Sequence, residues 1–95
     1  MNSYLIAYDV DTTTDVPKSY SQVYADVKGK LESYPVHGQL TESCWLILSD
    51  ATHVDIRDAF RGLMRPSDRL LVLKSANVAA WHNLKSPAGW VRDNI

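Results

Sequence analysis

A short apolar run near the N-terminus restricts the possible folds more than any other segment of this chain. Five of the six residues from Tyr4 to Asp9 can lie in an apolar layer. The run is rich in residues that favour strands, and a Thr- and Asp-rich segment typical of turns follows it. It therefore predicts a buried central strand, and Asp9 would stand at the end of that strand.

The rest of the chain reads as alternating helices and strands. A polar connection at residues 10–18 precedes a helix that Ser19 and Gln22 should cap and that Pro35 should stop. The other expected elements are strands at 36–40, 42–48 and 69–74, a second helix capped by Thr52 with Asp55, and a short terminal helix with Ser86 as its N-cap.

This order predicts an α+β fold, the ferredoxin-like βαββαβ arrangement with an antiparallel sheet and both main helices on one face. Residues 1–95 should form a single domain, with a core at 3–75 and a tail at 76–95 that docks on it or on a partner through Trp81 and Trp90. The other sheet face has no helix in this count, and strands this apolar need cover. We therefore expect the tail or a second copy of the protein to cover that face, and we predict a homodimer.

Composition excludes some classes of protein. A formal net charge of −1 and a pI near 6.2 provide no overall basic field of the kind that duplex-binding proteins carry. No apolar run approaches the roughly 20 residues of a membrane-spanning helix, and the N-terminus lacks the pattern of a signal peptide. We expect a soluble, cytoplasmic protein with no membrane partner, in which the single cysteine, Cys44, is a core residue.

Three segments also resemble a known family. They are Tyr4 to Asp9, Ser43 to Ile47 and Ser67 to Val72, and the match extends over residues 3–75. In order and spacing they resemble the small ferredoxin-like proteins of the CRISPR-associated protein 2 and virulence-associated protein D families, and most of all the stand-alone relatives often labelled SinR-like. The resemblance implies a homodimer packed through its sheets, with the aspartate that ends the first strand of each subunit facing a cleft near the two-fold axis.

Asp9 matches that aspartate. The resemblance implies that Asp9 is a catalytic residue that binds Mg²⁺ and promotes phosphodiester hydrolysis. Mg²⁺ takes oxygen ligands and keeps several waters, so Asp11 could supply a further metal ligand. Asp15 is a weaker candidate, because an Asp in a Thr-rich turn commonly caps its own backbone. A purely structural role for Asp9 stays open.

Several other residues are candidates for contacts with nucleic acid. Arg57, Arg61 and Arg65 recur every four residues, so they could follow a phosphate backbone or form a solvated helix face paired with acidic neighbours. Tyr8 faces either the core or a stacked base, and alternation along the strand means that it cannot share a face with its neighbour. His37 could be a proton shuttle or a plain surface histidine.

Two classes of function remain open. One is a Mg²⁺-dependent endonuclease that acts on RNA or DNA, as in prokaryotic defence. The other is a non-catalytic dimer that binds nucleic acid or protein, since the resemblance also covers dimers that act chiefly as DNA-binding scaffolds. The acidic pI favours the scaffold, whereas the aspartate at the strand end and the acidic residues near it favour the nuclease.

Overall fold

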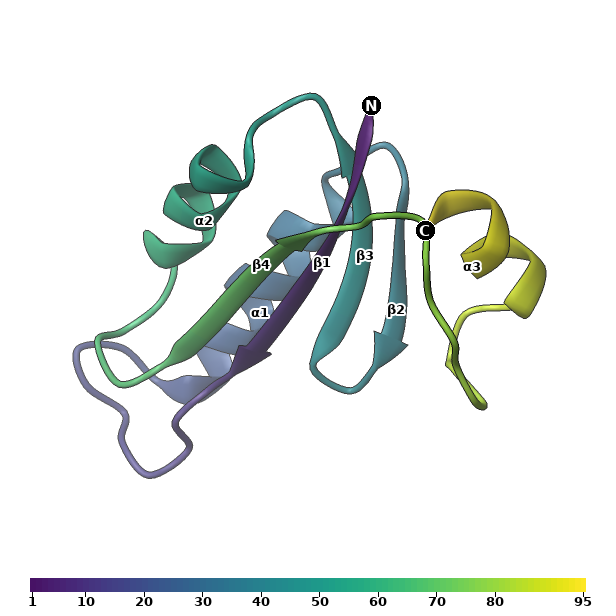
Figure 1. Ribbon diagram of the computed structural model, residues 1–95. Coiled ribbons are helices and arrows are strands. Elements are labelled where there is room, and N and C mark those ends of the chain that lie inside the picture. Colours follow the sequence, from purple (N-terminus) through teal and green to yellow (C-terminus); the bar gives the residue numbers. More distant parts are fainter.

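Four strands form one antiparallel sheet, and helices lie on both of its faces (Figure 1). The computed structural model describes all residues 1–95. Its elements, in chain order, are β1 (Asn2–Asp9), α1 (Tyr20–Glu32), β2 (His37–Thr41), β3 (Cys44–Ser49), α2 (His53–Arg61), β4 (Arg69–Lys74) and α3 (Ala88–Asn94). The strands lie in the order β2-β3-β1-β4, and every neighbouring pair is antiparallel. The predictions of an α+β fold, an antiparallel sheet and a central first strand are confirmed.

The even-numbered residues of β1 face the main core. Alternate side chains of a strand point to opposite faces, and Tyr4, Ile6 and Tyr8 are all buried on the face that α1 and α2 cover. The helices contribute residues that recur every four positions along one stripe, and the buried ones are Val23, Val27, Leu31, Ile56 and Phe60. Burial of one such side chain contributes roughly 1.5–3 kcal/mol, so this layer supplies most of the hydrophobic stabilisation.

Side-chain caps begin α1 and α2 where the sequence predicts them. Ser19 Oγ accepts a hydrogen bond from the Gln22 N–H, and Thr52 Oγ1 accepts one from the Asp55 N–H, each at 3.1 Å. The Gln22 side chain does not complete the capping box, because its amide donates to Asp26 at 2.7 Å. None of the helices has the length and apolar character needed to cross a membrane.

The C-terminal tail covers half of the second sheet face, which carries the odd-numbered residues of β1. Val91 of α3 is fully buried in a small cluster with Leu40 and Leu46. The Ser3 hydroxyl donates a hydrogen bond to the carbonyl of Asn94, which ties the end of α3 to the start of β1. The tail therefore packs on the sheet of its own chain, which is one of the two alternatives that the sequence leaves open.

The predicted cap of α3 is wrong in detail. Ser86 Oγ donates a hydrogen bond to the Gln39 carbonyl at 2.7 Å, so it anchors the tail to β2. The helix begins at Ala88 after Pro87, and no side chain caps it. Ser86 therefore contributes a long-range contact that the local sequence pattern does not specify.

The rest of the second face is open to solvent. Leu71 and Leu73 of β4 pair with Ala7 and Leu5 of β1, and the two leucines are 55% and 54% exposed. We call Ala7, Leu71 and Leu73 the open half-face. The tail thus meets only part of the predicted need for cover.

A matched pair of glycine substitutions tests how the tail is held. A Cβ atom on Gly38 would lie 2.5 and 2.6 Å from ring atoms of Trp90, whereas a Cβ atom on Gly29 has nothing within 4 Å. We expect Gly38→Ala to displace the tail and lower the free energy of unfolding by about 2 kcal/mol. Gly29→Ala should raise it by up to about 1 kcal/mol, because alanine favours the helix.

Amide hydrogen exchange in α3 and urea unfolding measure both effects. Exchange in α3 should become faster in Gly38→Ala and stay unchanged in Gly29→Ala. Unchanged exchange and stability in Gly38→Ala would contradict the close packing of β2 against Trp90.

Candidate functional site

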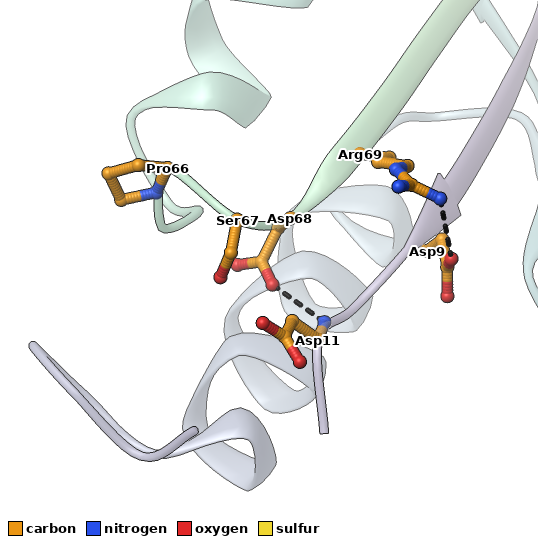
Figure 2. A pocket seen from close by; sticks show the side chains of 6 residues that line it. All are labelled: Asp9, Asp11, Pro66, Ser67, Asp68 and Arg69. Carbon is orange, nitrogen blue, oxygen red and sulfur yellow. Dashed lines mark hydrogen bonds and ion pairs between the residues drawn. The ribbon is translucent and has the colours of Figure 1, made fainter. Parts of the chain in front are cut away.

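A polar depression lies where the carboxyl end of β1 meets the turn between α2 and β4 (Figure 2). Its volume is about 560 Å³, and the residues that line it are Asp9, Asp11, Pro66, Ser67, Asp68 and Arg69. Both carboxylates that the sequence predicts as metal ligands therefore border the same depression. Asp68, which the sequence analysis did not single out, is a third.

Asp9 is the exposed end of β1. Its side chain is 75% exposed, and its odd position places it on the second sheet face. Asp9 lies opposite Arg69 in the register of β1 and β4, with 3.9 Å between Asp9 Oδ2 and Arg69 Nη1. A pair this exposed contributes little to stability, so both side chains can exchange this contact for one with a ligand or a second chain.

Asp11 is engaged with its own loop. Its Oδ1 accepts a hydrogen bond from the Thr13 hydroxyl and another, at 2.9 Å, from the Thr13 N–H. These bonds hold the pKa of Asp11 below its ordinary value. The carboxylate therefore stabilises the turn, which is the structural alternative expected for an Asp in a Thr-rich segment.

The residues of one chain do not fit a Mg²⁺ site. Figure 2 shows the Asp9 carboxylate beside Arg69 and the Asp11 carboxylate below Ser67, so the two do not converge. No group of three or more His, Cys, Asp or Glu side chains is arranged to hold a metal ion. A shared site would require the Asp9 side chains of two copies to meet.

A buried ion pair forms the floor of this region. Arg65 and Asp68 have side-chain exposures of 1% and 0%, and 3.1 Å separates Arg65 Nη2 from Asp68 Oδ1. The Asp68 carboxylate also accepts hydrogen bonds from Arg65 Nε and from the backbone N–H groups of Arg65 and Asp11. Its capacity as an acceptor is thus filled by donors of the protein itself.

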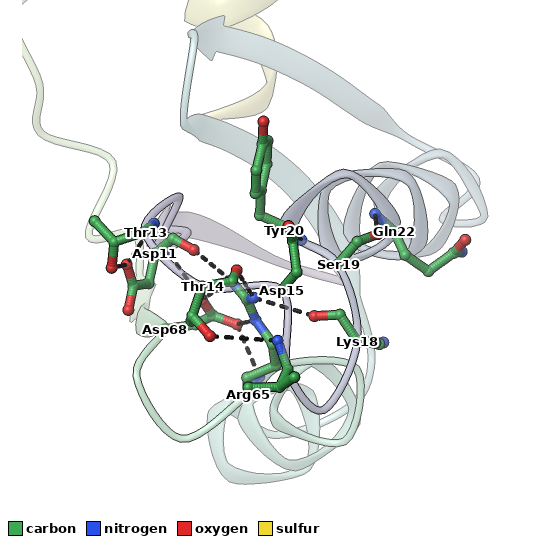
Figure 3. A network of polar contacts seen from close by, with 11 residues as sticks. Asp11, Thr13, Thr14, Asp15, Lys18, Ser19, Tyr20, Gln22, Arg65 and Asp68 are labelled. Atoms are coloured by element: carbon green, nitrogen blue, oxygen red, sulfur yellow. Dashed lines mark hydrogen bonds and ion pairs between the residues drawn. The ribbon is translucent and has the colours of Figure 1, made fainter.

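The guanidinium of Arg65 organises the β1–α1 loop (Figure 3). It donates hydrogen bonds to the carbonyl oxygens of Asp11, Thr14 and Lys18, which span most of that loop. An arginine offers five N–H donors in a fixed plane, and here they join a loop to a turn more than forty positions away in the sequence. Arg65 therefore positions the loop that carries Asp11.

The environment of Asp68 favours its charged form. Burial alone would raise its pKa, but the hydrogen bonds and charge of Arg65, together with the Asp11 N–H, hold the pKa of Asp68 below its ordinary value. The carboxylate is thus ionised at neutral pH and balances the buried guanidinium. The sequence does contain a signal for this ion pair: Asp68 lies three positions after Arg65 and directly before β4.

The predicted ridge of arginines is wrong for one of its three members. Helix α2 ends at Arg61, so the four-residue spacing no longer places Arg65 on the same face. Arg57 and Arg61 remain exposed and both contact Asp58, at 2.9 and 3.2 Å. Arg65 is buried and cannot follow a phosphate backbone without unfolding the loop.

Tyr8 also lies away from solvent. It is 9% exposed and belongs to the main core. Burial raises the pKa of its hydroxyl. Of the two alternatives for Tyr8, the structure supports a core residue and contradicts a platform for a stacked base.

The two weaker candidates have local structural roles. Asp15 Oδ1 accepts a hydrogen bond from the Tyr20 N–H at 3.3 Å, in the first turn of α1. His37 Nδ1 lies 2.8 Å from the Tyr34 carbonyl oxygen, and its ring tilts against Trp45. Neither residue lines the depression beside Asp9.

Comparison with family models, with curated proteins and with solved structures finds no match to this chain. The resemblance to the CRISPR-associated protein 2 family therefore stays a prediction, and the function has to be argued from the site and the surfaces.

Removal of the Asp68 charge tests the buried pair. Asp68→Asn keeps the shape of the side chain but leaves Arg65 buried without a counterion, and we expect the melting temperature to fall by roughly 10 °C or more. Asp93→Asn is the control, because Asp93 is exposed and forms no ion pair, and it should melt as the wild type does. Equal melting temperatures for both variants would refute the importance of the pair.

The pair also predicts how stability depends on pH. The pKa of Asp68 is lower in the folded chain than in the unfolded chain, so the unfolded chain takes up the proton first as the pH falls. The wild type should lose this stabilisation progressively below about pH 4. Urea unfolding between pH 7 and 3 should give a shallower acid decline for Asp68→Asn than for the wild type.

Proposed function

We propose that this chain is a ferredoxin-like binding module that acts as a homodimer, with the open half-face at the dimer interface. The observation that supports the proposal is a sheet face that its own tail covers over only one half. The order of strands and the βαββαβ succession up to Lys74 agree with a ferredoxin-like domain. The resemblance to the CRISPR-associated protein 2 family points to the same assembly.

The open half-face has the chemistry of an interface. Leu71 and Leu73 are separated by one residue and lie on the same face of β4, and Ala7 is in register with Leu71. A contiguous exposed apolar patch on a small domain commonly marks an interaction surface. Asp9 and Arg69 border it at one end, so in a two-fold dimer they could form ion pairs between subunits as well as within one.

A binding role explains the polar depression better than catalysis does. Asp68 is saturated by donors, Asp11 stabilises its own turn, and Asp9 has a cationic neighbour in Arg69. No second group is positioned to share acid–base work with Asp9. We infer that the dimer serves as a scaffold for a partner macromolecule.

Charge substitution on the open half-face tests the dimer. Leu71→Glu with Leu73→Glu would bury carboxylates at the interface, and we expect dimerisation to weaken by at least about 100-fold. Val16→Glu is the control, because Val16 is 73% exposed on a loop distant in sequence from β4. Size-exclusion chromatography with light scattering should give a dimer for the wild type and the control, and a monomer for the double variant. A monomeric wild type at high concentration would exclude the proposal.

A second candidate function is a Mg²⁺-dependent nuclease that acts on RNA or DNA. The exposure of Asp9 at the rim of the depression is the observation that favours it. In this case the Asp9 side chains of two copies would supply the metal ligands, as the family resemblance implies.

Cleavage assays separate the two functions. If the nuclease proposal holds, Mg²⁺-dependent cleavage of RNA or DNA should slow by at least about 100-fold in Asp9→Ala, while Asp93→Ala keeps the wild-type rate. Light scattering should confirm that Asp9→Ala has the oligomeric state of the wild type. A wild type that cleaves no RNA or DNA with Mg²⁺ would exclude the nuclease and leave the scaffold.

A further inference from the structure

The outer edge of β4 presents unpaired backbone groups. The Ser75 N–H donates a hydrogen bond to the Ser3 carbonyl at 2.9 Å. In the same register, the odd-numbered residues of β4 lie opposite the odd-numbered residues of β1: Leu73 opposite Leu5, Leu71 opposite Ala7 and Arg69 opposite Asp9. In an antiparallel pair, residues alternate between those that bond the neighbouring strand and those that point away from it. The N–H and C=O groups of Leu70, Val72 and Lys74 therefore point away from β1, at the free edge of the sheet.

Two depressions follow this edge on its helix side. One, of about 200 Å³, is bordered by His53, Val54, Arg57, Leu70, Leu71 and Val72. The other, of about 270 Å³, extends past Arg57 and Arg61 toward the end of α2. Arg57 and Leu70 border both, so the depressions form one groove between α2 and the edge of β4. We call it the β4 groove.

The β4 groove is apolar along its strand side and basic along its helix side. Leu70 and Val72 pack against the main core and present only part of their surface. Arg57 and Arg61 share a single carboxylate, that of Asp58, so one positive charge stays uncompensated there. No carboxylate borders the depression at His53. The groove thus has three parallel rows: the free backbone groups of the β4 edge, the apolar side chains of Leu70 and Val72, and the positive charges of Arg57 and Arg61.

We propose that the β4 groove binds an extended, acidic segment of a protein partner, which adds to the sheet as a further strand. The backbone of the segment would bond the free groups of Leu70, Val72 and Lys74. Side chains on its helix side would meet Arg57 and Arg61, which favour carboxylates, and those on its other side would lie beside Leu71 and favour apolar residues. The segment therefore alternates acidic and apolar residues. This partner site lies along the edge and helix side of β4 and shares only Leu71 with the proposed dimer interface. It rests on the proposed scaffold function and names the kind of macromolecule that the scaffold holds.

Charge argues against a second copy of β4 as the occupant. In the antiparallel register centred on Val72, Lys74 of the second copy would lie opposite Leu70, next to Arg57 and Arg61 of the first. Like charges at facing positions destabilise a strand pair. Basic residues at the ends of an edge strand also commonly prevent edges from pairing with themselves. An acidic segment meets no such repulsion.

A short peptide that alternates Glu and Val is the probe for this site. We expect the labelled peptide to bind the full-length protein in fluorescence anisotropy, and to shift the amide NMR signals of Leu70, Val72 and Lys74. Arg57→Glu with Arg61→Glu should weaken binding by about tenfold or more, whereas Arg92→Glu, at an exposed position of α3, should leave it unchanged. Circular dichroism verifies that both variants are folded.

Two further peptides identify the basis of binding. A peptide that alternates Lys and Val tests the charge, and a Glu/Val peptide with N-methylated backbone amides tests the strand addition. We expect each of them to bind at least about tenfold more weakly than the Glu/Val peptide. Equal binding of all three peptides, or NMR shifts confined to other surfaces, would overturn the proposal. So would concentration-dependent shifts of Leu70, Val72 and Lys74 that persist in the Leu71→Glu, Leu73→Glu variant, since they would identify a second copy as the occupant of the edge. The Leu71→Glu, Leu73→Glu test of the dimer is read by oligomeric state, so the two proposals can fail separately.

Discussion

The buried pair of Arg65 and Asp68 is the constraint on which the end of the molecule that carries the candidate site depends. Two charges buried away from water need good mutual geometry and hydrogen-bond partners for all their donors and acceptors. Backbone groups of the β1–α1 loop supply many of these partners. The loop at residues 10–18 therefore takes its shape from a turn distant in sequence. Because the same turn leads directly into Arg69, the pair also fixes the register in which Asp9 and Arg69 face each other.

The two faces of the sheet differ in how completely they are covered. The main core between the sheet and the two long helices is closed, since its residues on β1 and α1 are almost fully buried. The second face is closed only where α3 packs on it, around Val91. The edge and outer half of β4 stay accessible because the tail crosses to β2 and not to β4. The two surfaces that we propose as binding sites therefore adjoin the same strand, β4.

The sequence predicts local structure well and long-range side-chain roles poorly. Apolar periodicity located the strands and helices, and hydroxyl caps at Ser19 and Thr52 marked two helix starts. The site was harder to predict. The spacing of four residues would place Arg65 on the face of Arg57 and Arg61 only if the helix continued to Arg65. Helix α2 ends at Arg61, and the Arg65 guanidinium is buried beneath the β1–α1 loop. For Tyr8 periodicity left two faces open, and only packing against the helices decides between them.

The neighbourhood of Asp9 separates its two possible roles on electrostatic grounds. Two carboxylates facing across a dimer axis repel each other, and a divalent cation between them is one way to remove that repulsion. In this chain each Asp9 is paired across the strands with Arg69, so every copy brings its own cation to the same edge. A dimer can then satisfy both aspartates through crossed ion pairs, without a metal ion. The position opposite Asp9 in β4 therefore separates the two proposed functions as clearly as Asp9 does: an arginine there favours the proposed dimer contact over the proposed metal ligand.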